Sequence, residues 1–438
     1  MIDKAFQEKV SDRSVRVGVI GLGYVGLPLA AAFADAGVRV LGFDVDAEKV
    51  RRIGSGRSYI QAVSEERLGA HVQEGRLEAT TDFGRLGEPD AILICVPTPL
   101  TVHRDPDLSY VRRATEQIAT HLRTGQLVVL ESTTYPGTTD EVVQPLLEAT
   151  GLALDRDFLL AFSPEREEPG KQEHTITRIP KVVGGASPGS LDAACALYDL
   201  VVPSTVRVSS TRAAEAAKLT ENIFRAVNIA LVNELKMIFD RMAIDVREVL
   251  DAASSKPFGF MRFDPGPGWG GHCIPVDPFY LAWKAREVQL TARFVELAGS
   301  INVEMPHYVV GRLQRALNDR GLPVRGSKVL LLGLAYKKDV DDPRESPAFE
   351  ILHLLLDLGA EVSYHDPFIA QAPAMRSWPD LPAMRSVPLE ASTLETFDAV
   401  VVVTDHTGVD YELVARHAPL VVDTRGVLRG QRENVLSA

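Results

Sequence analysis

Cysteines are few in this 438-residue chain, and long apolar segments and basic clusters are lacking. The three cysteines are widely spaced, which argues against a disulfide framework or a paired-cysteine metal site. No apolar run approaches the length of a membrane span, and the polar N-terminal residues lack the apolar centre of a signal peptide. The formal net charge of −12 and the lack of a Lys/Arg-rich run argue against nucleic-acid and membrane partners. We therefore expect a cytoplasmic protein with reduced thiols and no bound metal.

The rest of the composition, 45% hydrophobic and 24% charged, is typical of a globular protein, and the length predicts two or three domains. Apolar, β-branched runs alternate with helical patterns in the first half of the chain, which indicates an α/β fold. The predicted strands there are 15–20, 38–46, 91–96, 127–132, 158–163 and 181–185. Because helical patterns lie between most of them, we expect a parallel, doubly wound sheet.

The pattern changes near residue 211. Two long helical patterns follow, 211–244 and about 290–318, with a glycine-rich loop between them. A second strand–helix–strand pattern begins near residue 326. Further predicted strands lie in 360–367, 397–406 and 420–426. We predict two Rossmann-like doubly wound α/β domains, 1–210 and 323–438, joined by a central all-helical domain, 211–322, with a long connecting helix.

A dinucleotide-binding motif follows the first predicted strand. Gly21, Gly23 and Gly26 form GxGxxG at the start of a helix, where they serve a tight turn, close approach of a pyrophosphate and helix packing. Asp44 ends the next strand, where a carboxylate would accept hydrogen bonds from ribose hydroxyls and repel a 2′-phosphate. The motif predicts NAD rather than NADP, although Lys49 nearby could meet a phosphate. The alternative is a glycine-rich turn in an α/β domain that binds nothing.

The second α/β pattern lacks GxGxxG and carries basic residues instead. Lys337, Lys338 and Arg344 surround the end of its first strand, which predicts an anionic ligand such as a second nucleotide. A solvated charged loop explains the same residues equally well.

The stretch GWGGHCIPVDP, residues 268–278, places one cysteine in an unusual setting. Cys95 lies in an apolar strand pattern and Cys195 in an amphipathic helix pattern, so both are expected in the core. Cys273 instead follows glycines in a loop where backbone can approach a ligand. Nucleophile and structural thiol are both open interpretations. His272 is disfavoured as its base, because adjacent side chains in an extended loop usually point apart.

The first long helix carries a candidate activator of that thiol. Glu215, Lys218 and Asn222 fall on one face, and Asn228 and Asn233 stand among apolar residues, where an unbonded amide is costly. An ammonium and an amide in a cleft would stabilise an oxyanion and favour a thiolate. A solvated polar stripe is the alternative.

A nucleotide domain, a thiol and an oxyanion-stabilising pair predict a two-stage oxidation. One hydride leaves a carbinol to give an aldehyde, and the thiolate adds to give a thiohemiacetal. Loss of a second hydride gives a thioester, and water then releases an acid. Asp277 and Thr133 are candidates to hold that water.

Several motifs in the same order resemble those of the UDP-glucose/GDP-mannose dehydrogenase family over nearly the whole chain. They are GLGYVGLPLA, VPTP, ESTTYPGTT, SPER, AAEAAKLTENIFRAVNIALVNEL, GGHCIPVDP and GLAYKKDVDDPRESPA. Members that oxidise UDP-glucose usually carry a GGSCFxKD-like loop, whereas Val276 stands here at the position of that lysine. GGHCIPVDP, VPTPLTVHRDPDLSYV and KPFGF instead resemble the branch that oxidises UDP-N-acetylglucosamine at C6 to the uronate for surface polysaccharides. UDP-GalNAc, UDP-ManNAc and UDP-glucose are alternative substrates.

The resemblance also implies a role for each matching residue. The implied catalytic residues are Cys273, Lys218, Asn222, Asp277, Thr133 and Glu165, with Cys273 forming the thiohemiacetal and thioester. The implied NAD contacts are Gly21, Gly23, Tyr24, Val25, Gly26, Asp44, Lys49, Thr98, Thr133 and Arg344. The implied UDP-sugar contacts are Glu165, Lys218, Asn222, Lys337 and Arg425. Arg262 lies roughly where related enzymes use an arginine from a neighbouring subunit, and its role stays open, as does that of His272.

The resemblance implies a homodimer or higher homo-oligomer built on the central helices.

Two other functions are weighed against the four-electron oxidation. A two-electron β-hydroxyacid-type dehydrogenase would need neither Cys273 nor a second α/β domain. A catalytically silent NAD-binding protein would tolerate loss of the thiol and of the Lys218 and Asn222 pair, and the sequence retains all three.

Overall fold

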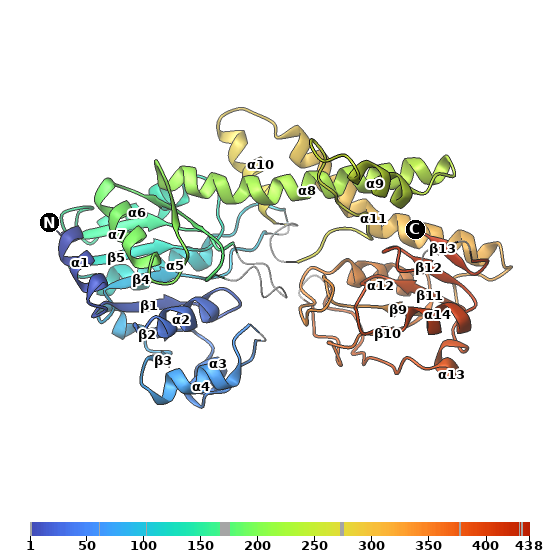
Figure 1. Ribbon diagram of the computed structural model, residues 1–438, viewed down its shortest axis with the longest axis horizontal. Helices are drawn as coiled ribbons and strands as arrows, with labels where there is room; N and C mark the ends of the chain where they lie inside the picture. Colours follow the sequence, from blue (N-terminus) through green and yellow to red (C-terminus); the bar gives the residue numbers. More distant parts are fainter. Residues whose placement is uncertain are drawn as a thin grey trace. The chain divides into compact units, whose positions relative to one another are not determined.

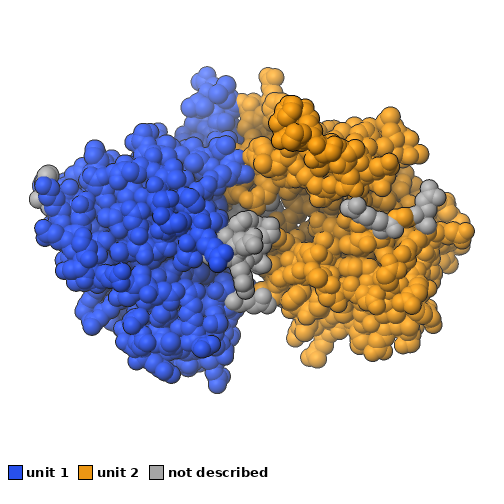
Figure 2. Space-filling model, viewed as in Figure 1, with its two compact units in different colours: residues 1–221, 279–290 blue, residues 222–278, 291–438 orange. Residues whose placement is uncertain are grey.

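The computed structural model describes residues 2–60, 62–101, 103–166, 176–271, 276–375, 378–428, 430 and 432–438. The chain forms two compact units, shown in different colours in Figure 2. Unit 1 comprises Met1–Glu221 and Phe279–Leu290, and unit 2 comprises Asn222–Pro278 and Thr291–Ala438. No helix in the described ranges is both long and apolar enough to cross a membrane.

Unit 1 is built on an eight-stranded sheet with the order β3-β2-β1-β4-β5-β6-β7-β8 (Figure 1). The strands are β1 (Arg16–Ile20), β2 (Arg39–Phe43), β3 (Leu77–Thr80), β4 (Ala91–Ile94), β5 (Gln126–Leu130), β6 (Phe158–Phe162), β7 (Lys181–Gly185) and β8 (Thr205–Val208). Every neighbouring pair is parallel except β6 and β7. The predicted doubly wound sheet is confirmed, but its all-parallel form is wrong at this one pair. No helix separates β6 from β7 among the described residues, so the crossover that parallel pairing needs is not supplied there.

Six strands of this sheet match predicted runs, and two were missed. The six have buried apolar residues on both faces, as expected for strands covered by helices. The missed strands β3 and β8 are four residues long and partly exposed, which weakens their pattern. The helices of unit 1 are α1 (Ile2–Ser11), α2 (Gly26–Asp35), α3 (Ala47–Gly54), α4 (Glu65–Gln73), η1 (Phe83–Gly87), α5 (Ser109–His121), η2 (Thr139–Val143), α6 (Gln144–Glu148) and α7 (Pro188–Tyr198). The polar N-terminal segment thus forms α1, which buries Phe6 and Val10 and packs against α7.

Unit 2 contains a five-stranded, fully parallel sheet with the order β10-β9-β11-β12-β13. Its strands are β9 (Lys328–Leu332), β10 (Glu361–His365), β11 (Ala399–Val402), β12 (Val421–Asp423) and β13 (Val435–Ser437). Its helices are α9 (Val246–Ser254), α11 (Arg293–Asn318), α12 (Pro347–Asp357), α13 (Ala391–Leu394) and α14 (Tyr411–His417). The second α/β pattern is therefore confirmed, with β13 as a strand that the sequence pattern did not reveal.

Two helices are shared by the units along the chain. α8 (Thr211–Arg241) is one continuous helix, and α10 is Asp277–Glu287 (Figure 1). Both predicted long helices, α8 and α11, are thus present within a few residues of their expected bounds.

Asn233 of α8 is a structural residue. It is fully buried, its Nδ2 donates to Asn302 Oδ1 at 2.8 Å, and its Oδ1 accepts the Gly266 N–H at 2.9 Å. The amide is therefore satisfied by α11 and by the loop after α9. Asn228 is half-buried and donates to the Phe224 carbonyl one turn earlier, so the two asparagines have different environments.

Candidate functional site

The glycine motif of unit 1 lies in the turn from β1 to α2. Gly21 has φ +91°, and a Cβ there would lie 2.5 Å from the Cys95 carbonyl oxygen. A Cβ on Gly26 would lie 1.9 Å from the Gly21 oxygen, so only glycine permits this turn and helix start. A Cβ on Gly23 would meet no protein atom within 4 Å. The turn is thus closed at its first and third glycines and open at the second, which fits the approach of a pyrophosphate.

Asp44 lies directly after β2 and is 6% exposed. Its Oδ2 accepts the Leu22 N–H at 2.9 Å, and its Oδ1 accepts the Asp46 N–H at 2.9 Å. Lys49 Nζ lies 3.4 Å from the Asp44 carboxylate, so this ammonium is paired with the acid. The carboxylate adjoins the glycine turn, where the ribose of a bound dinucleotide would need an acceptor.

Three residues link the strand-end loops of unit 1. The Thr98 hydroxyl donates to the Thr133 carbonyl at 2.8 Å, which brings these two predicted residues together. The Tyr280 hydroxyl, on α10, donates to the Thr98 carbonyl at 2.8 Å. The loops after β4 and β5 are therefore held at the edge of the sheet where ligands bind in doubly wound folds.

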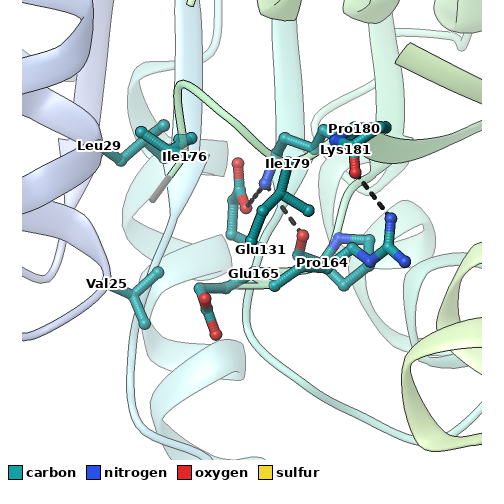
Figure 3. Close-up of a pocket in the computed structure, with 10 residues that line it drawn as sticks. Val25, Leu29, Glu131, Pro164, Glu165, Ile176, Ile179, Pro180 and Lys181 are labelled. Carbon is teal, nitrogen blue, oxygen red and sulfur yellow. Dashed lines mark hydrogen bonds and ion pairs between the residues drawn. The ribbon is translucent and has the colours of Figure 1, made fainter. Parts of the chain in front are cut away.

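Glu165 and Lys218 form the second cluster of unit 1. Lys218, 6% exposed on α8, donates to the Glu165 carbonyl at 2.5 Å, and its Nζ lies 3.6 Å from the Glu165 carboxylate. Glu165 also lines a pocket (Figure 3). The pocket is lined by Val25, Leu29, Glu131, Pro164, Glu165, Arg166, Ile176, Ile179, Pro180 and Lys181. Val25 belongs to the glycine motif, so this pocket adjoins the turn that fits a dinucleotide.

Glu215 has a different environment from Lys218, although both lie on α8. Its carboxylate accepts the Gly137 N–H at 2.5 Å, the Thr139 N–H at 2.9 Å and the Thr139 hydroxyl at 2.7 Å. Burial raises the pKa of Glu215 to about 7, against these hydrogen bonds, which favour the carboxylate. Glu215 thus anchors the turn that follows Thr133.

Asn222 and Asp277 meet within unit 2. The Asn222 Nδ2 donates to Asp277 Oδ2 at 2.5 Å, and the two residues are 2% exposed each. The contact joins two predicted catalytic residues that are 55 positions apart. Because Asp277 is the first residue of α10, its carboxylate also lies at the positive end of a helix dipole.

The glycine-rich loop before Asp277 packs on the C-terminal α/β domain. The Gly271 N–H donates to the Arg344 carbonyl at 3.2 Å. A Cβ on Gly270 would lie 2.9 Å from Tyr336 Cβ, and one on Gly271 would lie 2.8 Å from the Tyr336 ring. These two glycines are thus required for packing against Tyr336, whereas ligand approach was the expected reason. His272 and Cys273 lie outside the described residues.

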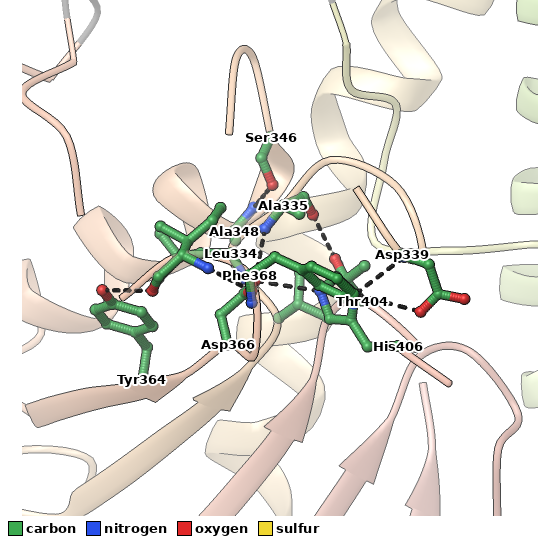
Figure 4. Close-up of polar contacts among 12 residues, drawn as sticks. Leu334, Ala335, Asp339, Ser346, Ala348, Tyr364, Asp366, Phe368, Thr404 and His406 are labelled. Carbon is green, nitrogen blue, oxygen red and sulfur yellow. Dashed lines mark hydrogen bonds and ion pairs between the residues drawn. The ribbon is translucent and has the colours of Figure 1, made fainter. Parts of the chain in front are cut away.

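The C-terminal sheet carries its own buried acid (Figure 4). Asp366 Oδ2 accepts the Leu334 and Ala335 N–H groups at 2.7 and 3.0 Å, and His406 Nε2 lies 3.2 Å away. Burial alone would raise the pKa of Asp366, but the hydrogen bonds from His406 and from backbone N–H groups lower it to about 2. The opposite nitrogen, His406 Nδ1, accepts the Asp339 N–H at 3.0 Å. Asp366 and His406 therefore hold both ends of the loop that carries Lys337.

The predicted basic residues of unit 2 have distinct partners. The Arg344 guanidinium pairs with Asp342 at 2.6 Å, and Arg425 Nε donates to the Val403 carbonyl at 2.7 Å. Lys338 is exposed and lies 4.0 Å from Asp405, whereas Lys337 is half-buried. Arg262 pairs with Asp251 and Asp264, so its guanidinium is held by acids of its own unit.

Cys95 and Cys195 are both buried, as predicted. Burial raises the pKa of both thiols, which makes them poor nucleophiles. No group of three metal-ligating side chains occurs in the part of the chain that the structure describes.

Sequence reasoning missed the buried residues that support these clusters. They are Glu131, Lys181 and Tyr198 in unit 1 and His406 in unit 2, whereas the acid that ends the 360–367 strand pattern, Asp366, was visible in the sequence. Their positions were the available signal. Glu131 directly follows the apolar strand β5, and Lys181 begins the buried strand β7, where a charge is costly unless it is paired.

The fold and the glycine turn define a dinucleotide-binding α/β protein with a second nucleotide-type domain. Three family models match the chain in order: the NAD binding domain of the UDP-glucose/GDP-mannose dehydrogenase family over residues 15–225, its central domain over 212–304 and its UDP binding domain over 330–430. The chain belongs to the UDP-glucose/GDP-mannose dehydrogenase family. It is therefore an NAD-dependent oxidoreductase of nucleotide sugars.

Relatives with different sugars are similarly close. The chain is 38% identical to a UDP-N-acetyl-D-glucosamine 6-dehydrogenase of Pseudomonas aeruginosa, over 84% of this chain and 86% of that protein. It is 37% identical to an NDP-N-acetyl-D-galactosaminuronic acid dehydrogenase of Ralstonia nicotianae, over 95% and 97%. A solved UDP-D-ManNAc dehydrogenase from Pyrococcus horikoshii superposes with a TM-score of 0.87 at 32% identity, covering 96% of this chain and 98% of that one. All three names specify N-acetylated sugars, and they differ in which one.

Proposed function

We propose that this enzyme oxidises the C6 hydroxyl of a UDP-linked N-acetylhexosamine, UDP-N-acetylglucosamine first among them, to the carboxylate in two hydride steps. The observation that carries the proposal is the buried hydrogen bond between Asn222 and Asp277. A buried amide–carboxylate pair has no packing advantage over apolar side chains, whereas acyl transfer uses both groups, and the carboxylate of this pair follows Cys273 by four residues. Overall, one alcohol, two NAD⁺ and one water give one carboxylate, two NADH and three protons.

The first step produces an aldehyde. The glycine turn would hold NAD, which would supply the acceptor for the hydride that leaves C6. We assign Lys218 to the hydroxyl, where its ammonium stabilises the developing alkoxide as the proton departs. The Glu165 carboxylate lies 3.6 Å from this ammonium, and we assign it to receive the proton through water.

The second stage uses Cys273 as the nucleophile. Its thiolate adds to the aldehyde carbon to form a C–S bond, and the carbonyl oxygen becomes an alkoxide. Lys218 and Asn222 are assigned to that oxygen. Departure of the second hydride re-forms the carbonyl and leaves a thioester on Cys273.

Water then breaks the C–S bond. We assign Asp277 and Thr133 to holding this water, with the Asp277 carboxylate as the base that takes its proton. Asn222 restrains that carboxylate through the 2.5 Å hydrogen bond. The thiolate leaves and is ready for the next turnover.

The binding roles are part of the same proposal. The assigned NAD contacts are Gly21, Gly23, Tyr24, Val25, Gly26, Asp44, Lys49, Thr98, Thr133 and Arg344. Lys337 and Arg425 are assigned to the UDP diphosphate, together with Glu165, Lys218 and Asn222 for the sugar. The proposed domains are 1–210 for NAD, 211–322 for the central helices and the cysteine loop, and 323–438 for UDP.

We also propose that the enzyme is a cytoplasmic homodimer built on α8 and α11. Phe224, Leu231 and Ile238 of α8 recur every seven residues and are 46–49% exposed. Phe294 and Leu297 at the start of α11 are 78% and 57% exposed. Apolar side chains repeated along exposed helices favour burial against a second copy.

The sugar is tested by comparing UDP-GlcNAc, UDP-GalNAc, UDP-ManNAc and UDP-glucose as substrates in one assay. The proposal predicts the highest kcat/KM for UDP-GlcNAc. A higher value for UDP-glucose would contradict the N-acetylhexosamine assignment, and a higher value for another N-acetylated sugar would correct the C2 or C4 configuration only.

A further inference from the structure

The segment that carries Glu165 is held by a buried lysine that has no part in the chemistry above. Lys181, the first residue of β7, is 5% exposed. Its Nζ donates to Glu131 Oε2 at 2.8 Å and to the Pro164 carbonyl at 3.0 Å (Figure 3). One ammonium thus connects the end of β5 with the loop after β6.

The lysine is itself fixed by its partner. Glu131 is 1% exposed, and its second oxygen accepts a hydrogen bond from the hydroxyl of Tyr198, which is fully buried on α7. The carboxylate therefore has a charged donor on one oxygen and a hydroxyl on the other. In a site of low polarity such a network holds the Lys181 ammonium in a single position.

The Pro164 carbonyl needs this donor because the strand pairing stops before it. The β6–β7 ladder pairs Ala161 with Gly185 and Phe162 with Gly184, and Ser163 bonds to the Val182 carbonyl through its hydroxyl at 2.8 Å. Pro164 lies beyond these contacts. The Lys181 ammonium takes the place of a ladder N–H as the donor to this carbonyl. A charged donor makes a stronger hydrogen bond than a neutral one.

The next carbonyl along the chain accepts the ammonium assigned to the reaction. Lys218 donates to the Glu165 carbonyl at 2.5 Å. Two consecutive carbonyls are therefore held by two different ammonium groups. Lys181 holds the Pro164 carbonyl, and Lys218 holds the Glu165 carbonyl. A shift of the Pro164 carbonyl would move both the anchor of Lys218 and the Glu165 side chain.

We propose that Lys181, oriented by Glu131 and Tyr198, is a positioning residue that sets the Lys218 ammonium and the Glu165 carboxylate for the first hydride step. The inference rests on the roles proposed above for Lys218 and Glu165. It also explains why a charged pair is kept in the core, since apolar replacements of buried ion pairs are often neutral or stabilising for the fold alone.

The test separates positioning from stability with three variants. Lys181→Met leaves Glu131 buried and unpaired, so it destabilises the fold as well as releasing Pro164. The double variant Lys181→Met, Glu131→Gln removes both charges and is expected to recover most of the thermal stability. Lys181→Arg retains a donor for Pro164. Lys236→Met is the matched control, because Lys236 is a lysine 2% exposed in unit 2 that pairs with Asp240.

We expect the double variant to lose about 10–100-fold in kcat, with the KM values for NAD and sugar little changed, because misplacement of a catalytic group acts on the chemical step. Lys181→Arg should recover part of that loss, and Lys236→Met should keep kcat. Wild-type kcat in the double variant would overturn the proposal.

A crystal structure of the double variant gives a readout that does not depend on activity. The proposal expects the Pro164 carbonyl to move and the hydrogen bond from Lys218 to the Glu165 carbonyl to lengthen or break. If this bond is unchanged, Lys181 has no positioning role. A wild-type enzyme that oxidises no UDP-sugar would instead contradict the proposed function, and the crystal structure would still decide the role of Lys181.

Discussion

The Asn222 side-chain amide donates a 2.5 Å hydrogen bond to the Asp277 carboxylate, and both groups are buried. Asp277 follows Cys273 by four residues, whereas Asn222 comes from the long helix α8. The contact holds the Asp277 carboxylate in place through its Oδ2 atom. That arrangement fits a base that activates water, so the last chemical step is where a change at Asp277 should be seen.

Asp277→Asn should trap the acyl-enzyme. The amide still offers an oxygen to Asn222 but no longer accepts a proton from water, so hydrolysis of the thioester slows. Rapid mixing should show a burst of about two NADH per active site before a slow steady rate, and intact mass should increase by one acylated substrate. Asp319→Asn serves as a control for the loss of one negative charge, because Asp319 is exposed. A steady rate equal to that of the wild type, with no adduct, would remove Asp277 from hydrolysis.

Asp44→Asn should weaken selection of the cofactor. Hydrogen bonds to a charged group contribute about 1.5–3 kcal/mol, so the KM for NAD should rise roughly 10–100-fold. The penalty against a 2′-phosphate should fall at the same time, so the NAD/NADP preference narrows. The KM values for NAD and for NADP, measured with a saturating UDP-sugar, test both expectations. An unchanged preference for NAD over NADP would show that another group selects the cofactor.

Glu215 should make stability depend on pH. Because burial raises its pKa from 4.5 to about 7, the folded protein keeps this proton over a range where the unfolded chain has lost it. The stabilisation is complete below pH 4.5 and is lost as the pH rises through about 7. Relative to Glu215→Gln, the wild type should lose on the order of 1–3 kcal/mol between about pH 5 and pH 8. Denaturant unfolding of both proteins at the two pH values measures this loss. If the difference in unfolding free energy between the wild type and the variant were the same at both pH values, the raised pKa would be contradicted.

His406→Phe should weaken UDP binding and spare NAD binding. The ring volume is kept, but the Asp339 N–H loses its acceptor and Asp366 loses one donor, at a cost of about 1–3 kcal/mol. Because the affected loop carries Lys337, titration calorimetry should show UDP affinity reduced about 10-fold. His417→Gln is the control, because His417 is a half-buried histidine of the same domain that pairs with Glu395. Equal losses for UDP and NAD would indicate general destabilisation.

Local patterns allowed much of the fold and part of the site to be predicted. The sequence predicted that Gly21 and Asp44 lie together because a turn, a helix start and a strand end fall within one short segment. The antiparallel β6–β7 pair was missed because the parallel prediction rested on the helical patterns between most of the other strands, and it was extended to β6 and β7, between which the described residues form no crossover helix. The contacts Asn222–Asp277 and Lys181–Glu131 join residues 55 and 50 positions apart, and a sequence pattern does not show which distant charges become neighbours.

The reasons for some residues also changed once packing was known. Gly270 and Gly271 were expected to admit a ligand, yet they lie against Tyr336. Asn233 suggested a cleft, yet it is satisfied by Asn302 and Gly266. In both cases the sequence marked a special position correctly, but the neighbour that required it came from a distant segment.

The most direct test of the account is the NADH yield per sugar in an exhaustive oxidation of UDP-GlcNAc. Two hydride steps through Cys273 predict about two NADH for each sugar consumed, with the uronate as the product and no free aldehyde. Cys273→Ser should abolish uronate formation while the fold remains intact. A yield of one NADH with release of the aldehyde, or uronate formation at the wild-type rate by Cys273→Ser, would contradict the account.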